Sequence, residues 1–152
     1  MKKLILLITL TTFVFSNSSA QSFSNNGYKI EGEIAGLQDS EIILAYYFGG
    51  KQYAKDTAMA KNGKFMFSGK ESLEGGMYLI VLPEQKWFDI IISEQRFKFK
   101  TSLNDLIGNM SFVNSKENTP FYKYLNFINN KQKDIAPIRE KLKSASAQET
   151  KE

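Results

Sequence analysis

The side chains that most often carry out chemistry in proteins are missing from this chain. Its 152 residues include neither cysteine nor histidine. The commonest metal ligands, the usual general base near neutral pH and all thiol redox chemistry are therefore unavailable. We accordingly expect a protein that is not an enzyme, with no catalytic residue, no metal and no cofactor.

Two glutamates form the only carboxylate pair whose spacing suggests catalysis. Glu31 and Glu33 lie on one face of an expected strand, roughly 7 Å apart by the rise of a strand. Carboxylates at about that separation can hydrolyse a glycosidic bond. Nothing in the surrounding sequence raises either pKa or builds a cleft, so a solvated strand face is favoured. A carboxylate-based hydrolase remains a third hypothesis for function.

A basic stripe alternates with aromatic residues further along the chain. Arg96, Lys98 and Lys100 share one face of a strand, and Phe97 and Phe99 share the other. The stripe could bind an anionic partner. Since the two phenylalanines supply a buried side for the same strand, an exposed charged face is the favoured interpretation.

Aromatic residues with polar tips could contact a ligand. Tyr46, Tyr47 and Trp87 are suited to stacking against a sugar or a peptide. Strand alternation turns about half of such residues inward, so core packing is favoured for some of them. A small-ligand or glycan-binding module is the alternative function that these three residues support.

The first twenty residues have the organisation of a secretory signal peptide. Lys2 and Lys3 precede an apolar run over 4–15, and small residues follow up to Ala20. The apolar run is shorter than the roughly 20 residues that a membrane-spanning helix needs. We expect cleavage between Ala20 and Gln21 and export to the periplasm or the medium.

Export also changes the charge of the chain. Loss of two lysines takes the formal net charge from +4 to +2. A charge this small does not indicate a nucleic-acid partner or an anionic membrane. No second long apolar run follows, so we expect no membrane span after cleavage.

The region that follows a short leader is patterned as a series of strands. Alternating or continuous apolar runs occupy residues 28–34, 41–47, 51–60, 64–68, 77–82, 86–92, 96–101 and 110–113. Asn62-Gly63 between two of these runs is a strong hairpin signal. The pattern predicts an all-β domain, an antiparallel β-sandwich or partly open barrel. The expected organisation is a signal peptide at 1–20, a leader at 21–27, the β-domain at 28–114 and a helical extension at 115–152.

The helical extension has an apolar face that changes character along its length. Asn118 or Thr119 is positioned to cap the helix, and Pro137 is expected to kink or divide it. The apolar residues at helical spacing are Phe121, Leu125, Ile128, Ile135, Ile138 and Leu142. We expect the first three to pack on the β-domain and the last three to remain available. After Leu142 the apolar pattern ends, and no Gly or Pro follows to terminate the helix. This fits either a truncated chain or a frayed terminus.

Four stretches, taken in order, resemble a known family. They are Gly32-Glu33-Ile34-Ala35-Gly36-Leu37 with Ile43-Leu44, Asp56-Thr57 with the run 62–69, Tyr78-Leu79-Ile80, and the run 113–118 leading into 121–124. Together they resemble the β-rich domain of unknown function that precedes thioredoxin-like domains in exported bacterial proteins of the thiol–disulfide interchange and peroxiredoxin-like types. The resemblance covers roughly residues 26 to 142.

The resemblance implies a role as well as a fold. In that family a helical segment joins the β-domain to a thioredoxin-like domain with a Cys-x-x-Cys pair. This chain ends in the helical segment and has no cysteine. The resemblance therefore implies a non-catalytic exported accessory domain, whose partner is another protein or an adjacent thioredoxin-like domain. It offers no catalytic residues to carry over, and the sequence does not indicate an oligomeric state.

Overall fold

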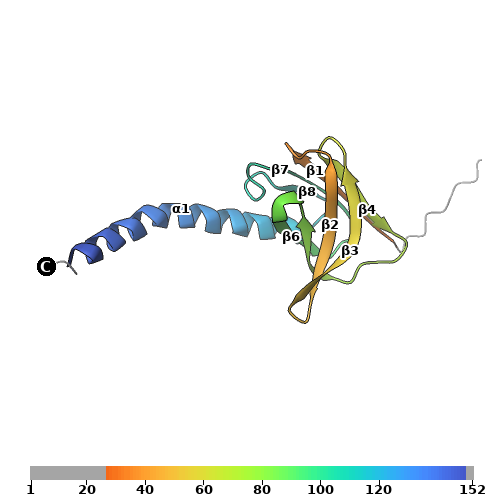
Figure 1. Ribbon diagram of the computed structural model, residues 1–152. Coiled ribbons are helices and arrows are strands. Elements are labelled where there is room, and N and C mark those ends of the chain that lie inside the picture. The colour runs from red at the N-terminus through yellow and green to blue at the C-terminus, as the bar shows by residue number, and fades with distance from the viewer. Residues whose placement is uncertain (1–26, 150–152) are drawn as a thin grey trace, which may run out of the picture.

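The computed structural model describes residues 27–149, with side chains as far as residue 144. The expected cleavage site at Ala20 and Gln21, the signal peptide and most of the leader lie outside these residues. The elements in chain order are β1 (Tyr28–Ala35), β2 (Ser40–Phe48), β3 (Lys51–Ala60), β4 (Lys64–Gly69), β5 (Gly76–Val81), a 3-10 turn η1 (Pro83–Gln85), β6 (Trp87–Ile92), β7 (Arg96–Ser102), β8 (Ser111–Val113) and α1 (Asn118–Glu149). The predicted β-rich fold with a C-terminal helix is confirmed (Figure 1).

The strands form two four-stranded sheets that share one core. Sheet A has the order β4-β1-β7-β8, and sheet B has the order β3-β2-β5-β6. Alternation along each strand turns one face of each sheet inward. Aliphatic and aromatic side chains from both sheets meet there in a single buried cluster. The outer faces of the two sheets are consequently the surfaces on which a site can be built.

One strand pair departs from the expected antiparallel arrangement. β1 pairs with β7 in parallel, from Lys29 opposite Arg96 to Ala35 opposite Ser102. Parallel neighbours need a long crossover, and here the connection contains all four strands of sheet B as well as β4. Short hairpin loops had suggested antiparallel pairing throughout, but β1 and β7 are not joined by a hairpin.

Close packing in the core explains the glycine in the middle of β1. A Cβ atom on Gly32 would lie 2.4 Å from the ring of Phe65 and 2.7 Å from that of Phe99. The Phe99 ring also meets Phe65 and Phe88 edge-on, with centroids 5.9 and 5.6 Å apart. Gly32 therefore makes room for the aromatic contacts that join sheet A to sheet B.

The tight turn predicted at Asn62-Gly63 is confirmed, but the strands on either side of it pair only through the Lys61–Lys64 bridge and belong to different sheets. Asn62 and Gly63 have positive φ angles, 49° and 74°, as a tight turn between two antiparallel strands requires. The Gly63 carbonyl accepts a hydrogen bond from the Ile34 amide at 2.8 Å. This turn passes the chain from sheet B at β3 to sheet A at β4.

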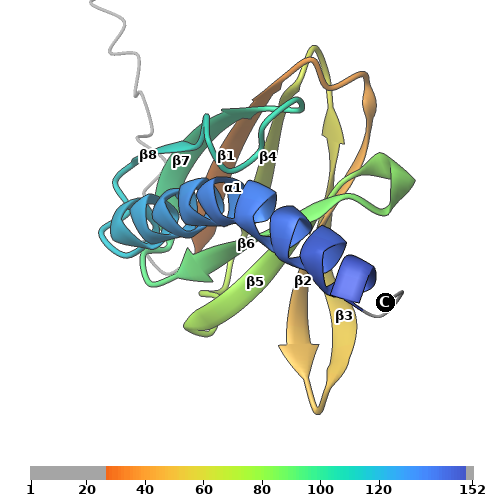
Figure 2. The ribbon, with the colours of Figure 1, turned by 90° about the vertical axis from the view of Figure 1, so that its left-hand side faces the viewer.

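We expected Pro137 to kink or divide the helix. The helix is continuous from Asn118 to Glu149, so Pro137 does not divide it. Every described side chain from residue 130 onward is exposed. Water can therefore reach the backbone carbonyl that proline leaves without a donor, which lowers the penalty of an internal proline. Figures 1 and 2 show that α1 leaves the domain and projects away from it instead of lying along either sheet.

The start of α1 is attached to the edge of sheet B by Asn118. This side chain is fully buried. Its Oδ1 accepts a hydrogen bond from the Ile91 amide at 2.8 Å, and its Nδ2 donates to the Ile91 carbonyl at 2.7 Å. Asn118 thus pairs with strand β6 in place of the helix cap that we expected, while Thr119 donates from Oγ1 to the Ser115 carbonyl.

Candidate functional site

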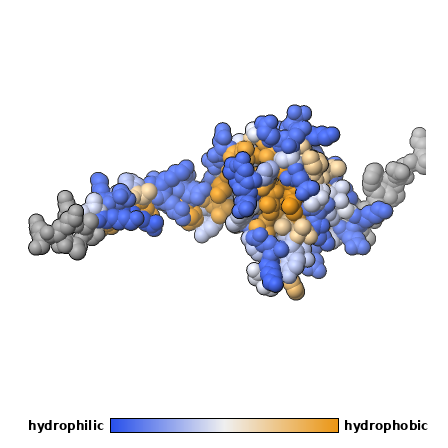
Figure 3. Space-filling view, viewed as in Figure 1, coloured by the Kyte–Doolittle hydropathy of each residue, from blue (hydrophilic) through white to orange (hydrophobic). Residues whose placement is uncertain are grey.

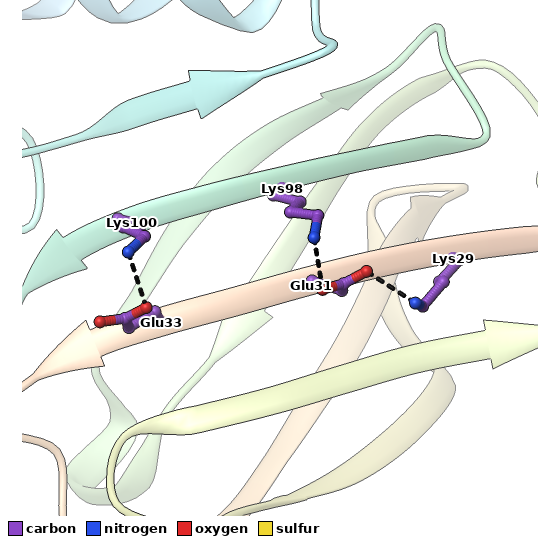
Figure 4. Close-up of polar contacts among 5 residues, drawn as sticks. All are labelled: Lys29, Glu31, Glu33, Lys98 and Lys100. Carbon is purple, nitrogen blue, oxygen red and sulfur yellow. Dashed lines mark ion pairs between the residues drawn. The ribbon is translucent and has the colours of Figure 1, made fainter.

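The two charged candidates from the sequence lie next to each other and neutralise each other. The parallel register sets Glu31 opposite Lys98 and Glu33 opposite Lys100. Figure 4 shows the resulting ion pairs, each with a nitrogen–oxygen distance of 3.0 Å. Lys29 adds a third ion pair to Glu31 at 2.7 Å. Lys98 and Lys100 of the stripe, the carboxylate pair and Lys29 are therefore one ladder of surface ion pairs, whereas Arg96 lies opposite Lys29 at its end.

This ladder lacks the electrostatics of a general acid. Hydrogen bonds from Lys29 and then Lys98 lower the pKa of Glu31, and a hydrogen bond from Lys100 lowers the pKa of Glu33. A glycosidase acid needs a raised pKa to hold its proton near neutrality. A hollow of about 480 Å³ lies over these residues, but it holds ionised, paired side chains. The geometry does not favour the hydrolase hypothesis.

The three aromatic candidates do not form a common platform. Tyr46 packs against the core, with its ring 5.8 Å from Tyr53 and 6.1 Å from Tyr78. Tyr47 faces the other side of β2 and is 44% exposed. Trp87 is 50% exposed, but it begins β6 opposite Val81, three residues along β5 from the partner of Tyr46.

The outer face of sheet B is apolar, and the sequence analysis did not identify it as a site. It is defined by alternation and register on β2, β5, β6 and β3. Its apolar members are Ile43, Ala45, Tyr47, Ala54, Met59, Met77, Leu79, Val81, Trp87 and Ile91. Asp89 lies among them, and Glu41, Gln52 and Thr57 are polar residues on the β2–β3 side of the same face. Figure 3 shows apolar surface gathered over the middle of the domain, where β2 runs.

The centre of this face is shielded although it lies outside the main core. Ala45 and Leu79 oppose each other across β2 and β5, and both are buried. Neither belongs to the core cluster between the sheets. Around them Met59 is 59% exposed and Met77 is 41% exposed. The outer face of sheet B thus has a small buried centre with flexible apolar side chains at its margin.

Asp89 is the acidic residue nearest the centre of this face, whereas Glu41 lies at its margin opposite Met59. Part of the Asp89 carboxylate has no partner. Asp89 lies opposite Leu79 on the neighbouring strand. Its Oδ1 is buried and accepts no hydrogen bond. Burial raises the pKa of the Asp89 carboxyl. A buried acceptor without a donor is unfavourable, so this position suits a donor or a cation supplied from outside the domain.

The backbone beneath Asp89 is held by the helix. Tyr122 is buried and donates its hydroxyl hydrogen to the Asp89 carbonyl at 2.7 Å. Burial, and then the negative charge of Asp89, raise the pKa of Tyr122. Together with Asn118 at Ile91, this contact fixes β6 at two alternate residues, so the edge strand of the apolar face is rigidly positioned.

The sequence contained a signal for this face. The run 41–47 is apolar on both faces, a pattern that predicts a strand covered on both sides or lying under a loop. The structure places no helix or strand of its described part over that second face. Asp89 could have been singled out as an acid between apolar neighbours on an alternating strand.

The described part of the chain has neither a cluster of metal-ligating residues nor a membrane-spanning helix. Residues 27–149 contain no group of three or more acidic residues arranged to hold a metal ion. No helix within the same residues is long and apolar enough to cross a membrane.

Comparisons with known proteins add one finding. The model of a family described as "Domain of unknown function (DUF4369)" matches residues 28–121. The match runs from the start of β1 into the first turns of α1. No curated protein and no solved structure matches the chain.

Proposed function

The chain belongs to the DUF4369 family of domains of unknown function, and from this premise we propose that it is an exported, non-catalytic accessory domain. Its two sheets act as a β-sandwich scaffold that presents the outer face of sheet B to another protein. The partner we propose is a thioredoxin-like domain, either joined to this one or encoded beside it. The single observation that carries the docking role is the apolar outer face of sheet B around Asp89.

The chemistry of this face fits a protein partner better than a sugar. Docking surfaces combine a shielded apolar centre with a few polar anchors. Here Leu79 and Ala45 form the centre, and Asp89 offers an unpaired acceptor. A partner that brings an amide or a cationic side chain to Oδ1 would remove an unfavourable buried group. We therefore expect the partner surface to be apolar with one basic or N–H-donating residue.

The glycan-binding alternative receives less support. Stacking of a sugar requires aromatic rings on one accessible surface, and Tyr46 is turned toward the core whereas Tyr47 and Trp87 are separated along sheet B. The family match gives no ligand. We therefore retain only the docking role as the proposal.

The first test is to read the DNA that follows the codon for Glu152. The reading frame, or the next one, should encode a domain with a Cys-x-x-Cys pair. The second test is calorimetric titration of the mature protein with that domain. Binding is expected, and Asp89→Ala and Met77→Lys should each weaken it about tenfold, as substitutions at the centre of a docking surface do.

A matched control separates docking from folding. Met66 is 49% exposed on the outer face of sheet A, so Met66→Lys adds the same charge to the other side of the domain. It should leave the titration unchanged. Equal effects of Met66→Lys and Met77→Lys, or no binding by the unaltered protein, would reject this face as the docking site.

A further inference from the structure

The second half of α1 carries apolar side chains that nothing in the described part of the chain covers. Ile135, Ile138 and Leu142 are 40%, 57% and 66% exposed. Beyond residue 130 the helix extends roughly 28 Å at the rise of an α-helix. A helix of this length without packing is marginally stable in water. Its exposed apolar side therefore needs a partner surface, and this surface is separate from the outer face of sheet B.

The spacing of these residues is that of a coiled coil. Ile128, Ile135 and Leu142 recur every seven residues, and Lys131 and Ile138 follow the first two by three residues. These are the a and d positions of a heptad repeat. We call Ile128, Lys131, Ile135, Ile138 and Leu142 the helix seam. Pro137 occupies a c position, away from the seam, so it does not interrupt the contact.

The domain itself decides the direction in which a second helix can approach. One heptad before Ile128, Phe121 lies on the same side of α1, and it packs with Leu125 against the core of its own domain. A parallel partner would have to place its own domain on this same side and at this same end. An antiparallel partner places its domain at the far end of the overlapping helices, where Figure 1 shows open space.

We propose that two copies of this chain associate by antiparallel pairing of the helix seam. The occupant of the exposed seam is thus the seam of a second copy. Ile135 of one copy lies in a layer with Ile138 of the other, and Lys131 lies in a layer with Leu142. The four isoleucines of the two copies form the centre of the contact, and the two-fold axis passes between them.

Charge complementarity selects this register. Asp134 and Lys141 occupy consecutive g positions, which face each other in an antiparallel pair. In the proposed register Asp134 of each copy faces Lys141 of the other. A shift by one heptad in one direction would place Lys141 of one copy opposite Lys141 of the other. A shift in the other direction would place the two Asp134 side chains opposite each other. Both shifts bring like charges together. On the opposite flank Arg139 faces the neutral Gln132.

The lysine within the seam is compatible with this contact. Lys131 Nζ lies 3.4 Å from Asp134 Oδ2 and 5.9 Å from the centre of the Phe127 ring. The ammonium group is therefore directed to the g side of the seam. The aliphatic part of the side chain remains available to cover Leu142 of the second copy.

The first experiment measures mass against concentration for the mature protein by sedimentation equilibrium. We expect a monomer–dimer equilibrium. Ile138→Ser should raise the dissociation constant at least about tenfold, because an apolar contact is lost twice in the symmetric pair. Phe48→Ser removes an apolar side chain that is more exposed than Ile138, 70% against 57%, from the β2–β3 hairpin. This change should leave the equilibrium unchanged. A monomer at every concentration would overturn the proposal.

A charge exchange tests the register. Asp134→Lys or Lys141→Asp alone should each raise the dissociation constant about tenfold, since two attractive pairs become repulsive. The double variant should restore the original value. Lys133→Asp changes the charge on the opposite side of the helix and serves as the control. Failure of the double variant to recover would reject the proposed register.

Disulfide cross-linking tests the relative direction of the two helices. The chain has no native cysteine that could form a competing disulfide. Lys131→Cys and Leu142→Cys proteins, prepared with tags of different size, are mixed and oxidised. The antiparallel pair predicts a disulfide between the two different proteins. Self-cross-linking of Leu142→Cys in preference to the mixed product would indicate a parallel pair and overturn the proposal.

Discussion

At the scale of single residues, Asn118 joins the helix to sheet B. It is buried at the junction between α1 and β6, where its amide forms hydrogen bonds to both the N–H and the C=O of Ile91. It also donates to the Ser115 hydroxyl at 2.9 Å. An edge strand presents unpaired backbone groups that must be satisfied. Asn118 satisfies two of them and fixes where the helix begins.

Replacing Asn118 should therefore destabilise the domain strongly. Asn118→Ala leaves the Ile91 amide and carbonyl buried without partners, and each such group costs about 1–3 kcal/mol. We expect the free energy of unfolding to fall by about 3 kcal/mol in urea. Asn126→Ala is the control, since Asn126 makes a single 3.3 Å hydrogen bond to the Ile107 carbonyl. Its loss should lower stability by at most about 1 kcal/mol. Similar losses for the two variants would contradict the role of Asn118.

Asp89 should make stability fall as pH rises from the acid range. Its pKa is raised in the folded state by burial, so the folded protein binds more protons than the unfolded chain over this interval. Stability then declines with pH until the folded-state pKa is passed. Asp89→Asn removes this penalty, so its gain over the unaltered protein should be larger at about pH 7 than at about pH 4. A gain that does not change with pH would show that the carboxylate is not the cause.

The glutamates of the ion-pair ladder act with the opposite sign. Their pKa values are lowered in the folded state, so their contribution is present above the ordinary carboxyl pKa and is lost on acidification. The sequence revealed the strand face on which Glu31 and Glu33 lie. It could not reveal that Lys98 and Lys100 lie opposite them, because no local pattern specifies a parallel pairing between β1 and β7. Sequence periodicity therefore cannot predict site chemistry that depends on pairing between strands far apart in the chain.

At the scale of elements, local chemistry allowed accurate prediction and distant contacts did not. The strands follow from period-two alternation, and the Asn62-Gly63 turn follows from the tolerance of both residues for positive φ. The continuity of α1 through Pro137 depends on solvent access to the opposing carbonyl, which is a property of the assembled molecule. The bare outer face of sheet B likewise depends on which elements happen to cover it.

The two halves of α1 should respond differently to the same substitution. Leu125 is partly buried against the core and Leu142 is 66% exposed. Leu125→Ala should lower the free energy of unfolding by about 2 kcal/mol, near the lower end for a buried leucine. Leu142→Ala should lower it by less than about 1 kcal/mol. Urea melts at a concentration where the protein is monomeric make the comparison. Equal losses would mean that α1 docks along its whole length.

At the scale of the whole molecule, the domain and the helix expose separate apolar surfaces, for which we propose different partners. The family match ends at residue 121, in the first turn of α1. The outer face of sheet B belongs to the matched region, and the helix seam lies beyond it. A dimer formed through the seam would leave both apolar sheet faces available, so each dimer could present two docking surfaces.

Export should yield a mature protein that starts at Gln21. The lysine pair, the apolar run and the small residues before Gln21 form the arrangement that signal peptidase processes. Expression in a Gram-negative host should place the product in the periplasmic fraction, with the mass of residues 21–152. A cytoplasmic product that retains Met1 would contradict the export prediction.

The mature protein should show no thiol–disulfide activity by itself. Reduction of a disulfide requires a thiolate nucleophile, and the chain has no cysteine to supply one. A sample verified by mass should therefore not raise the rate at which dithiothreitol reduces insulin above the rate without protein.

Addition of the Cys-x-x-Cys domain tests whether this chain acts as an accessory to that domain. If the accessory role is correct, that domain supplies all of the activity, and Met77→Lys alters the rate only when both proteins are present. Reduction of insulin by the cysteine-free protein alone would show that the catalytic group is one that the sequence does not reveal.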